Sequence, residues 1–377
     1  MPDAHDHDKS VNELMSAYWK RENRRVPVTF STDEHLWLNL AGRSFSDFYR
    51  NPKTHLDVYL AGLKWECDNI RADRAVSYPD RWRVCPRLWM EENQFFGCQV
   101  VYQENDYAWA KSLEGSKSDL LARIADTDAE ATIKNSEIWR LYCSCRELAD
   151  GMEFAGRPVE IVSPGQGTHG IFTKACEVRG IERFCMDLYE DPDFAHRFLD
   201  LVTDKEIERI RAWHKLAQTG VTLPLPGGWG LCDDSLQLIS AAAYRNFVLP
   251  RHERLFSVMT TGTRQIHLCG YAEQHYRCLR EELGVKVIDG PGPFVDHGKW
   301  LEALGDDFGF NAQMDHSILL IGTPTQVDRM MRDMLTPAAK KPGRFQISGY
   351  IVARTPLENV RAAYEAGWKY GQIQSAG

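Results

Sequence analysis

The chain lacks the features that would direct it to a membrane or to nucleic acid. None of its apolar runs approaches the roughly 20 residues that a bilayer span needs. Its net charge is −8, and its basic residues form no stripe with interleaved aromatics, so we expect no nucleic-acid binding. The acidic, polar start MPDAHDHDKS resembles neither a signal peptide nor a transit peptide. These absences predict a cytoplasmic protein.

Two further absences concern disulfides and nucleotides. The ten cysteines are spread through a large chain without an export signal, which suits reduced thiols better than a disulfide framework. Cys143 and Cys145 lie two apart in the helical stretch IWRLYCSCRELADG and do not face one another, so we interpret them as packing residues. No GxGxxG sequence occurs, although an open, doubly wound, nucleotide-binding sheet would carry one after an early strand.

The composition that remains is that of a globular protein, with 43% hydrophobic and 26% charged residues. At 377 residues the chain has room for one large α/β domain or two ordinary ones. We predict a flexible polar tail over residues 1–20 and a single domain over residues 21–377.

Strands and helices alternate through the C-terminal half. Expected helices cover about 191–219 and 240–260, and expected strands include RQIHL, VKVID, FGFNAQ and RFQIS. This rhythm indicates a parallel sheet. With the earlier strands RVPVTFS and RPVEIVS, we predict a closed (β/α)₈ TIM-like barrel with a helical or irregular N-terminal extension. Residues 45–150 would form an elaboration near the barrel mouth. An open doubly wound sheet is the alternative.

The stretch 264-RQIHLCG-270 contains the strongest candidate site. In a strand, residues two apart project to the same face, so His267 and Cys269 can aim at one point. Nitrogen and sulfur together favour zinc. The alternative is a core strand that ends in a buried His and a buried free Cys, because free Cys is among the most buried residue types.

Other polar residues follow predicted strands, where a parallel barrel places its chemistry. The pair Asp233-Asp234 follows VTLPLPGGWG, Asp289 ends VKVID, and Tyr350 follows RFQISG. Asp315-His316 follows FGFNAQM. For both pairs, capping of the following helix is the alternative.

Several blocks resemble the uroporphyrinogen decarboxylase superfamily in order and spacing. They are SPGQGTHGIFTKACEVRGIERF, SLQLISAAAYRNFVLPRHERLF, IHLCG, LGVKVID, LIGTPTQVDRMMRDML and RTPLENVRAAYEAGWKYG. The resemblance implies a TIM-like barrel, in agreement with the alternation of strands and helices.

Within that superfamily, the site residues resemble the corrinoid-dependent methyltransferases more than the decarboxylases. The decarboxylases hold porphyrinogen carboxylates with an Arg-rich QAGRY segment, which is absent here, and Arg81, Arg83 and Arg87 are the nearest candidates. The methyltransferases carry HxC, matched by His267 and Cys269, and a further Cys after a Gly near the last strand. This chain has Tyr350 at that position. Asp289 falls, by spacing, near the acidic zinc-site residue of cobalamin-independent methionine synthase.

The resemblance implies a demethylase-type methyltransferase. A metal held by one Cys, one His and one carboxylate is Lewis-acidic enough to polarise an ether oxygen, so an O-methyl compound is a candidate substrate. The chain has no corrinoid-binding DxHxxG segment, so we expect cobalamin to arrive on a separate corrinoid protein. We predict zinc ligands His267, Cys269 and Asp289, catalytic residues Tyr350, Asp234 and His316, and substrate-binding residues Asp233, Asp315 and Trp229.

Two alternatives stay open from the sequence. The first is a cofactor-free decarboxylase with Asp, Tyr and Arg groups at the same barrel mouth. The second is a non-enzymatic barrel that binds a small molecule or a corrinoid. The superfamily resemblance also implies a homodimer.

Overall fold

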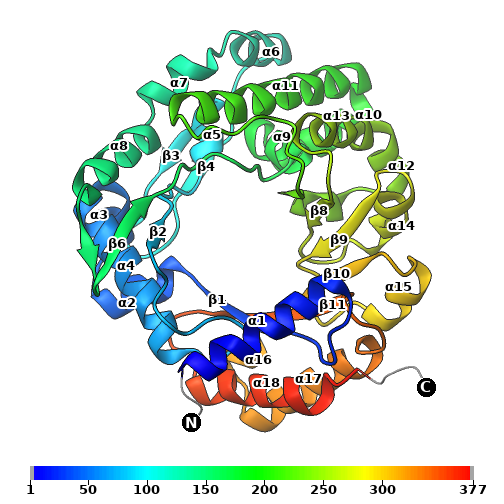
Figure 1. Cartoon of the computed structure of the whole chain (residues 1–377). Helices are drawn as coiled ribbons and strands as arrows, with labels where there is room; N and C mark the ends of the chain where they lie inside the picture. Colours follow the sequence, from blue (N-terminus) through cyan, green and yellow to red (C-terminus); the bar gives the residue numbers. More distant parts are fainter. Residues whose placement is uncertain (1–3, 374–377) are drawn as a thin grey trace.

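The computed structural model describes residues 4–373, and its centre is a ring of parallel strands with helices outside (Figure 1). Six strands pair in parallel in the order β1, β11, β10, β9, β8, β7. Their bounds are β1 Val28–Thr32, β7 Trp229–Cys232, β8 Arg264–His267, β9 Val285–Asp289, β10 Gly309–Gln313 and β11 Phe345–Ile351. The predicted strands in the C-terminal half are therefore present and parallel.

Two more parallel strands continue the ring but belong to a separate sheet. β2 (Trp82–Val84) pairs in parallel with β6 (Arg157–Ile161), and β5 (Glu153–Phe154) pairs antiparallel with β6. A small hairpin, β3 (Gln99–Val101) with β4 (Trp109–Lys111), completes the strands of residues 4–373. β2 lies within the 45–150 segment, so that segment contributes a strand of the ring as well as an elaboration.

The prediction of a closed barrel is not met by the hydrogen bonding of residues 4–373, where strand pairs do not connect β1 to β2 or β6 to β7. Other groups occupy both free edges. The Val28 N–H donates to the Asp73 carboxylate at 2.7 Å, and the Asp73 N–H donates to the Val28 carbonyl at 2.8 Å. At the other seam, the Cys232 N–H donates to the Thr168 carbonyl at 3.1 Å. Loop groups thus satisfy the strand edges that ladder closure would use.

Helices follow the strands of the C-terminal half as the alternation predicts. The long helix expected at about 191–219 is α11 (Pro192–Leu216). The others are α9 Ile171–Arg179, α10 Ile181–Glu190, the 3₁₀ turn η1 Asp234–Leu238, α12 Ala241–Ala243, the π turn η2 Tyr244–Val248, α13 Leu249–Met259, α14 Glu273–Glu281, α15 His297–Ala303, α16 His316–Ile321, α17 Pro324–Ala338 and α18 Leu357–Tyr370.

The N-terminal part is more helical than the sequence suggests. Its helices are α1 Ala4–Lys20, α2 Glu34–Ala41, α3 Phe45–Arg50, α4 Pro52–Asn69, α5 Glu91–Phe95, α6 Lys117–Ala125, α7 Ala129–Asn135 and α8 Glu137–Ala149. None of the helices between residues 4 and 373 is both long and apolar enough to cross a lipid bilayer.

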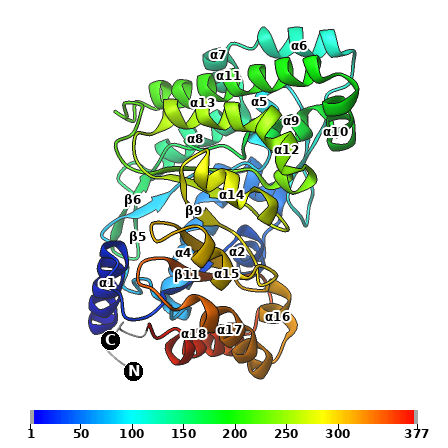
Figure 2. The ribbon, with the colours of Figure 1, turned by 90° about the vertical axis from the view of Figure 1, so that its right-hand side faces the viewer.

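The prediction of a flexible tail over residues 1–20 is wrong for residues 4–20, which form α1. This helix buries Val11 and Tyr18, and its Asp8 carboxylate accepts the backbone N–H groups of Val76 and Ser77. Arg21, just after α1, donates to the Asp306 carbonyl at 2.6 Å, ahead of β10. The helix therefore packs near the amino ends of the strands, at one edge of the molecule (Figure 2).

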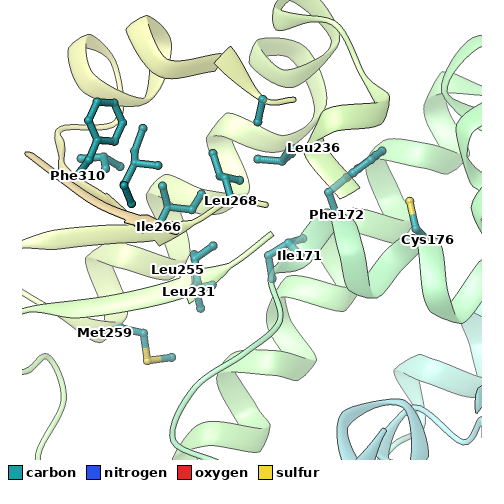
Figure 3. Close-up of a cluster of buried hydrophobic side chains, with 14 of the residues drawn as sticks. Ile171, Phe172, Cys176, Leu231, Leu236, Leu255, Met259, Ile266, Leu268 and Phe310 are labelled. Atoms are coloured by element: carbon teal, nitrogen blue, oxygen red, sulfur yellow. The ribbon is translucent and has the colours of Figure 1, made fainter. Parts of the chain in front are cut away.

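The core beneath the candidate site follows the period-two pattern of its strands. Ile266 and Leu268 are fully buried, while His267 between them is only half-buried. Figure 3 shows Ile266 and Leu268 in one cluster with Leu231 of β7 and Leu255 of α13. Burial of this apolar face fixes the opposite face of β8, and with it the direction of His267.

Candidate metal centre and adjoining cavity

The HxC segment leaves its strand through a turn that requires glycine. His267 is the last residue of β8, Cys269 is exposed, and Gly270 has φ +71°, a conformation that L side chains rarely adopt. A Cβ at position 270 would lie 2.3 Å from the Gln237 side-chain oxygen. The turn therefore holds the Cys269 thiol at the carboxyl end of the ring.

Three potential metal ligands converge at this point. The ligand atoms of Asp234, His267 and Cys269 all lie within 4.8 Å of one another. His267 Nε2 lies 3.0 Å from Cys269 Sγ and 3.9 Å from Asp234 Oδ1. Asp234 also accepts the Cys269 N–H at 2.7 Å, which ties the end of β7 to the end of β8. Nitrogen, sulfur and oxygen donors, one from each residue, are a set that zinc accepts.

Asp289, predicted as the third ligand, instead lies behind the histidine. His267 Nδ1 donates to Asp289 Oδ2 at 2.6 Å, and the Asn311 amide donates to the other Asp289 oxygen. Strand register produces this chain, because His267 pairs with Asp289 across β8 and β9, and Asp289 pairs with Asn311 across β9 and β10. Nε2 is therefore the ring atom left for a metal, with Asp289 in the position of an orienting carboxylate.

The electrostatics of the histidine reflect the same contacts. Burial acts to lower the pKa of His267, but the hydrogen bonds to Asp289 and Cys269 outweigh it and raise the pKa to about 10.

The His267 ring is also packed against Gly290, which has φ +98°. A Cβ at position 290 would lie 2.8 Å from His267 Cε1, so only glycine lets the ring occupy this place.

The three side chains match a divalent metal site both in the type of donor atom and in the number of ligands. A catalytic zinc needs three protein ligands and an open position for water or substrate. Asp234, His267 and Cys269 supply three donors, and the exposed Cys269 side is open to solvent.

Tyr350 and His316 lie together on another side of the mouth. Tyr350 pairs in register with Ser31 of β1, and the His316 ring is 5.7 Å from it, edge to face. Burial, followed by the nearby Asp33 and Glu34 carboxylates, raises the pKa of Tyr350 above its usual range, so its hydroxyl stays protonated. Burial lowers the pKa of His316.

Asp233 does not have a free carboxylate for a substrate. It is fully buried and accepts hydrogen bonds from the Phe172 N–H, the Thr173 N–H and hydroxyl, and His252 Nε2. Its role is to fix the start of α9 against the end of β7. The substrate-binding prediction for Asp233 is corrected to a structural role.

Asp315 and Trp229 are likewise not brought to the metal group. Asp315 is the N-cap of α16 and accepts the N–H groups of Ser317 and Ile318, as the capping alternative predicts. Trp229 begins β7, on the order of 10 Å along the strand from Cys232, and packs edge to face on Phe256. It lies toward the amino end of the ring, away from the site.

A cavity of about 440 Å³ adjoins the metal group, and Asp234 lines both. It lies at the carboxyl ends of β2, β6 and β7, and its wall includes Arg87, Leu88, Trp89, Met90, Glu92, Asn93, Ile138, Pro164, His169, Lys174 and Glu177. A volume of this size suits a small organic molecule. The three candidate ligands, which we call the metal corner, therefore lie beside this cavity.

A match to a known family covers most of the chain. Residues 93–370 match the family described as Uroporphyrinogen decarboxylase (URO-D). The chain belongs to this family. The match covers Asp234, the 264–270 segment and about half of the cavity wall, whereas the wall residues between Cys85 and Glu92 precede it.

Two Methanosarcina mazei proteins are similar to this URO-D family member. A methylated-thiol--coenzyme M methyltransferase is 30% identical over 201 residues, which cover 52% of this chain and 50% of the relative, so the chain spans about half the length of the curated relative it matches. A solved methyltransferase structure aligns over 96% of this chain and 98% of its own, with a TM-score of 0.66 at 15% identity, which shows a common fold. A B12-independent methionine synthase from Shewanella aligns at 11% identity over 92% of this chain and 98% of its own, with a TM-score of only 0.39.

Several residues near the candidate site were not predicted from the sequence. Asn311 is a polar residue inside the apolar strand FGFNAQ, and this was a signal in the sequence that its half-buried side chain has a partner at the site. Trp89, Asn93 and His169 come from segments with no strand pattern around them, so their convergence on the cavity depends on tertiary structure. Asp234 was predicted as catalytic, and the structure places it among the metal-ligand candidates.

Proposed function

We propose that this URO-D family protein is a methyltransferase that moves a methyl group between a small methylated substrate and a corrinoid carried by a separate protein. The observation that carries the proposal is the convergence of Asp234, His267 and Cys269 at the carboxyl ends of neighbouring strands. The family membership and the relative named as a methylated-thiol--coenzyme M methyltransferase support the same reaction class.

His267 Nε2, Cys269 Sγ and an Asp234 oxygen would hold a divalent metal, most simply zinc. When bound, such a metal acts as a Lewis acid on the heteroatom that carries the methyl group. Asp289 and Asn311 keep the His267 ring oriented, with Nε2 facing the other two donors. Both Cys269 and His267 must be deprotonated to bind metal, so binding should weaken as the pH falls.

Methyl transfer from an ether needs the departing oxygen to be stabilised, because an alkoxide or phenoxide is a poor leaving group. In this step the carbon–oxygen bond would break, the Co(I) of the corrinoid would supply the electron pair of the new bond to the methyl carbon, and the departing oxygen would take a proton from solvent. Tyr350 keeps its hydroxyl protonated and lies beside His316 and near Arg87, away from the metal group, so we assign it a hydrogen bond to the far end of the substrate rather than to this oxygen. The cavity beside Asp234 would hold the body of the substrate.

The test is a methyl-transfer assay with free cob(I)alamin as the acceptor. Zinc-loaded protein and a panel of small O-methyl and S-methyl compounds should convert cob(I)alamin to methylcobalamin, followed by its absorbance. Cys269→Ser should abolish the conversion, and Asp315→Asn should leave it unchanged. Release of carbon dioxide from a carboxylated substrate without any methylcobalamin would instead establish the decarboxylase alternative.

A further inference from the structure

Arg87 and His169 line the cavity with exposed side chains, and each lies against a buried carboxylate on its inner side. Arg87 Nη1 lies 3.5 Å from Glu34 Oε1, and His169 Nδ1 lies 3.3 Å from Glu92 Oε1. The carboxylate side chains are 1% and 6% exposed, whereas those of Arg87 and His169 are 54% and 49% exposed. Each side chain is therefore held on its inner side and open on the other, and the Glu92 carboxylate raises the pKa of His169. For His169, the contact through Nδ1 leaves Nε2 for a ligand.

Apart from Asp234 at the candidate metal group, the acidic residues of the cavity wall are glutamates that already have partners. Glu92 also accepts the His169 N–H at 3.2 Å and lies 3.3 Å from the buried Arg209 guanidinium. Glu177 pairs with Lys174 at 2.6 Å, and the Lys174 ammonium is itself buried. These carboxylates are neutralised within the protein, so they do not make the cavity a receptor for cations.

Two buried donors of the wall have no hydrogen-bond partner within residues 4–373. They are the Trp89 indole nitrogen and the Asn93 side-chain nitrogen. The Asn93 oxygen accepts from Lys174 at 2.7 Å, which fixes its amide orientation and leaves the nitrogen unpaired. Buried polar groups are rarely left unsatisfied, and such a group needs an explanation. Both unmatched groups are donors, so the missing partner is an acceptor.

The remaining wall is apolar and contains a flat aromatic surface. Leu88, Met90, Ile138 and Pro164 line it, together with the ring of Trp89. That ring is braced by Tyr107, 4.7 Å away between centroids, and lies 6.3 Å from the His169 ring. A rigid aromatic wall suits a flat apolar ligand body.

We propose that this cavity binds a small, flat, apolar molecule through a compact oxyanion, with Arg87, His169, Trp89 and Asn93 as the anion's hydrogen-bond donors. The inference rests on the proposed function in one respect: the methylated end of the molecule would point to Asp234 at the metal corner. The substrate class is therefore a methylated aromatic acid. A carboxylate or a sulfonate meets the donor requirement, and their relative affinities tell which is preferred.

Binding alone tests this inference, without metal or corrinoid. Isothermal titration calorimetry on the full chain would compare 4-methoxybenzoate, 4-methoxybenzenesulfonate and the neutral isostere 4-methoxybenzamide. We expect at least one anion to bind tenfold or more tightly than the amide, roughly the effect of one or two charge-assisted hydrogen bonds. Arg87→Gln and His169→Gln should each weaken anion binding by about tenfold and change amide binding by less than about twofold.

Arg83→Gln is the matched control. Arg83 lies four residues from Arg87, is exposed, contacts Glu160 and does not line the cavity, so its loss should not affect binding. If the amide binds wild type as tightly as both anions, or if neither anion binds, the inference is overturned whatever the variants do. If an anion binds with the expected preference but no methylcobalamin forms in the transfer assay, the cavity assignment stands and the methyltransferase proposal fails.

Discussion

His267 is held on both ring nitrogens and on one ring edge. Asp289 fixes Nδ1, Cys269 and Asp234 face Nε2, and Gly290 leaves room for Cε1. Because a metal ligand's outer partners set its tautomer and basicity, Asp289 is a positioning residue rather than a ligand in this geometry. The roles of Asp234 and Asp289 can be separated by experiment.

Asp289→Asn should weaken zinc binding by about tenfold to a hundredfold, because the amide can no longer accept as strongly from the imidazolium or imidazole N–H. Activity at saturating zinc should largely return, since the three ligands remain. Chelator competition measures the affinity, and a zinc titration of the methyl-transfer rate measures the recovery. Asp234→Ala should not be rescued by zinc, and equal rescue of both variants would contradict the assignment.

Gly290→Ala should displace the His267 ring while leaving all three candidate metal ligands in the sequence. The added Cβ would approach His267 Cε1 to 2.8 Å at a φ of +98°, so both the ring and the turn must shift. We expect zinc affinity to fall by at least about tenfold, comparable with loss of an outer partner. Gly292→Ala, where a Cβ would meet nothing within 4 Å, is the control. Unchanged zinc affinity in Gly290→Ala would show that the ring is not constrained there.

At this scale the sequence indicated His267, Cys269 and both neighbouring carboxylates, but it exchanged the roles that the geometry favours for Asp234 and Asp289. His267 and Cys269 could be predicted because strand geometry alone places i and i+2 on one face. The choice between Asp234 and Asp289 depends on the relative register and ends of three strands, which no local pattern encodes. Asp233 and Asp234 are adjacent but opposite in role, since one is fully buried as a cap and the other faces the site.

Among the elements, two helices place neutral histidines in the core. His55 of α4 is stacked on Phe48 with ring centroids 4.1 Å apart, and His297 begins α15 among Phe310 and Phe345. Burial lowers the pKa of each to about 4, against opposing hydrogen bonds to backbone carbonyls. The ordinary value for histidine is about 6.5.

These two histidines predict acid destabilisation in a defined window. Below about pH 6.5 the unfolded chain binds protons at both residues, whereas the folded chain does so only near pH 4. Their contribution to stability is therefore complete above about pH 6.5 and declines as the pH falls toward 4, by on the order of 3 kcal/mol for each residue.

His55→Phe should flatten this decline, since the ring stays and the titration is lost. Urea unfolding at several pH values between 7 and 4 measures the slope, with the exposed His5→Gln as the control. A slope that is the same in His55→Phe and wild type would show that His55 titrates normally in the folded state.

The helices and strands could be predicted where short stretches of sequence carry their own pattern of apolar and capping residues. β8 to β11 and α11, α17 and α18 have clear apolar periods, caps or flanking Pro and Gly, and they appear where expected. β2 is only three residues long within an aromatic-rich segment, so it could not be distinguished from loop. α1 was missed because its sequence is polar, and specific contacts such as those of Asp8 secure it.

At the scale of the whole molecule, no strand ladder within residues 4–373 joins β1 to β2, and we call this gap in the ring the β1 seam. One buried carboxylate, Asp73, connects the segments that meet there. Asp73 pairs with Arg25 at 2.5 and 2.6 Å, accepts the Val28 N–H, and accepts the Tyr364 hydroxyl of α18 at 3.1 Å. Arg25 in turn lies over the Trp368 ring at 3.9 Å. The start, the β1–β2 connection and the end of the described chain therefore meet at this residue, and side-chain bonds replace the missing strand ladder.

Asp73→Ala should destabilise the fold strongly, because it leaves the buried Arg25 without its partner. Removing one member of such a pair costs about 3–5 kcal/mol. Urea unfolding at pH 7 measures the loss, with the exposed Asp80→Ala as the control. A change below about 1 kcal/mol, the size of a surface ion pair, would mean that Asp73 does not hold this seam.

The most direct test of the central claim is the metal content of the intact protein. Native mass spectrometry after zinc loading and buffer exchange should find one zinc per wild-type chain. Cys269→Ser and His267→Ala should lose it while circular dichroism shows the same fold, and Asp315→Asn should retain it. Wild-type protein that stays metal-free, or Cys269→Ser that keeps one zinc per chain and full activity, would contradict a metal centre built on Asp234, His267 and Cys269.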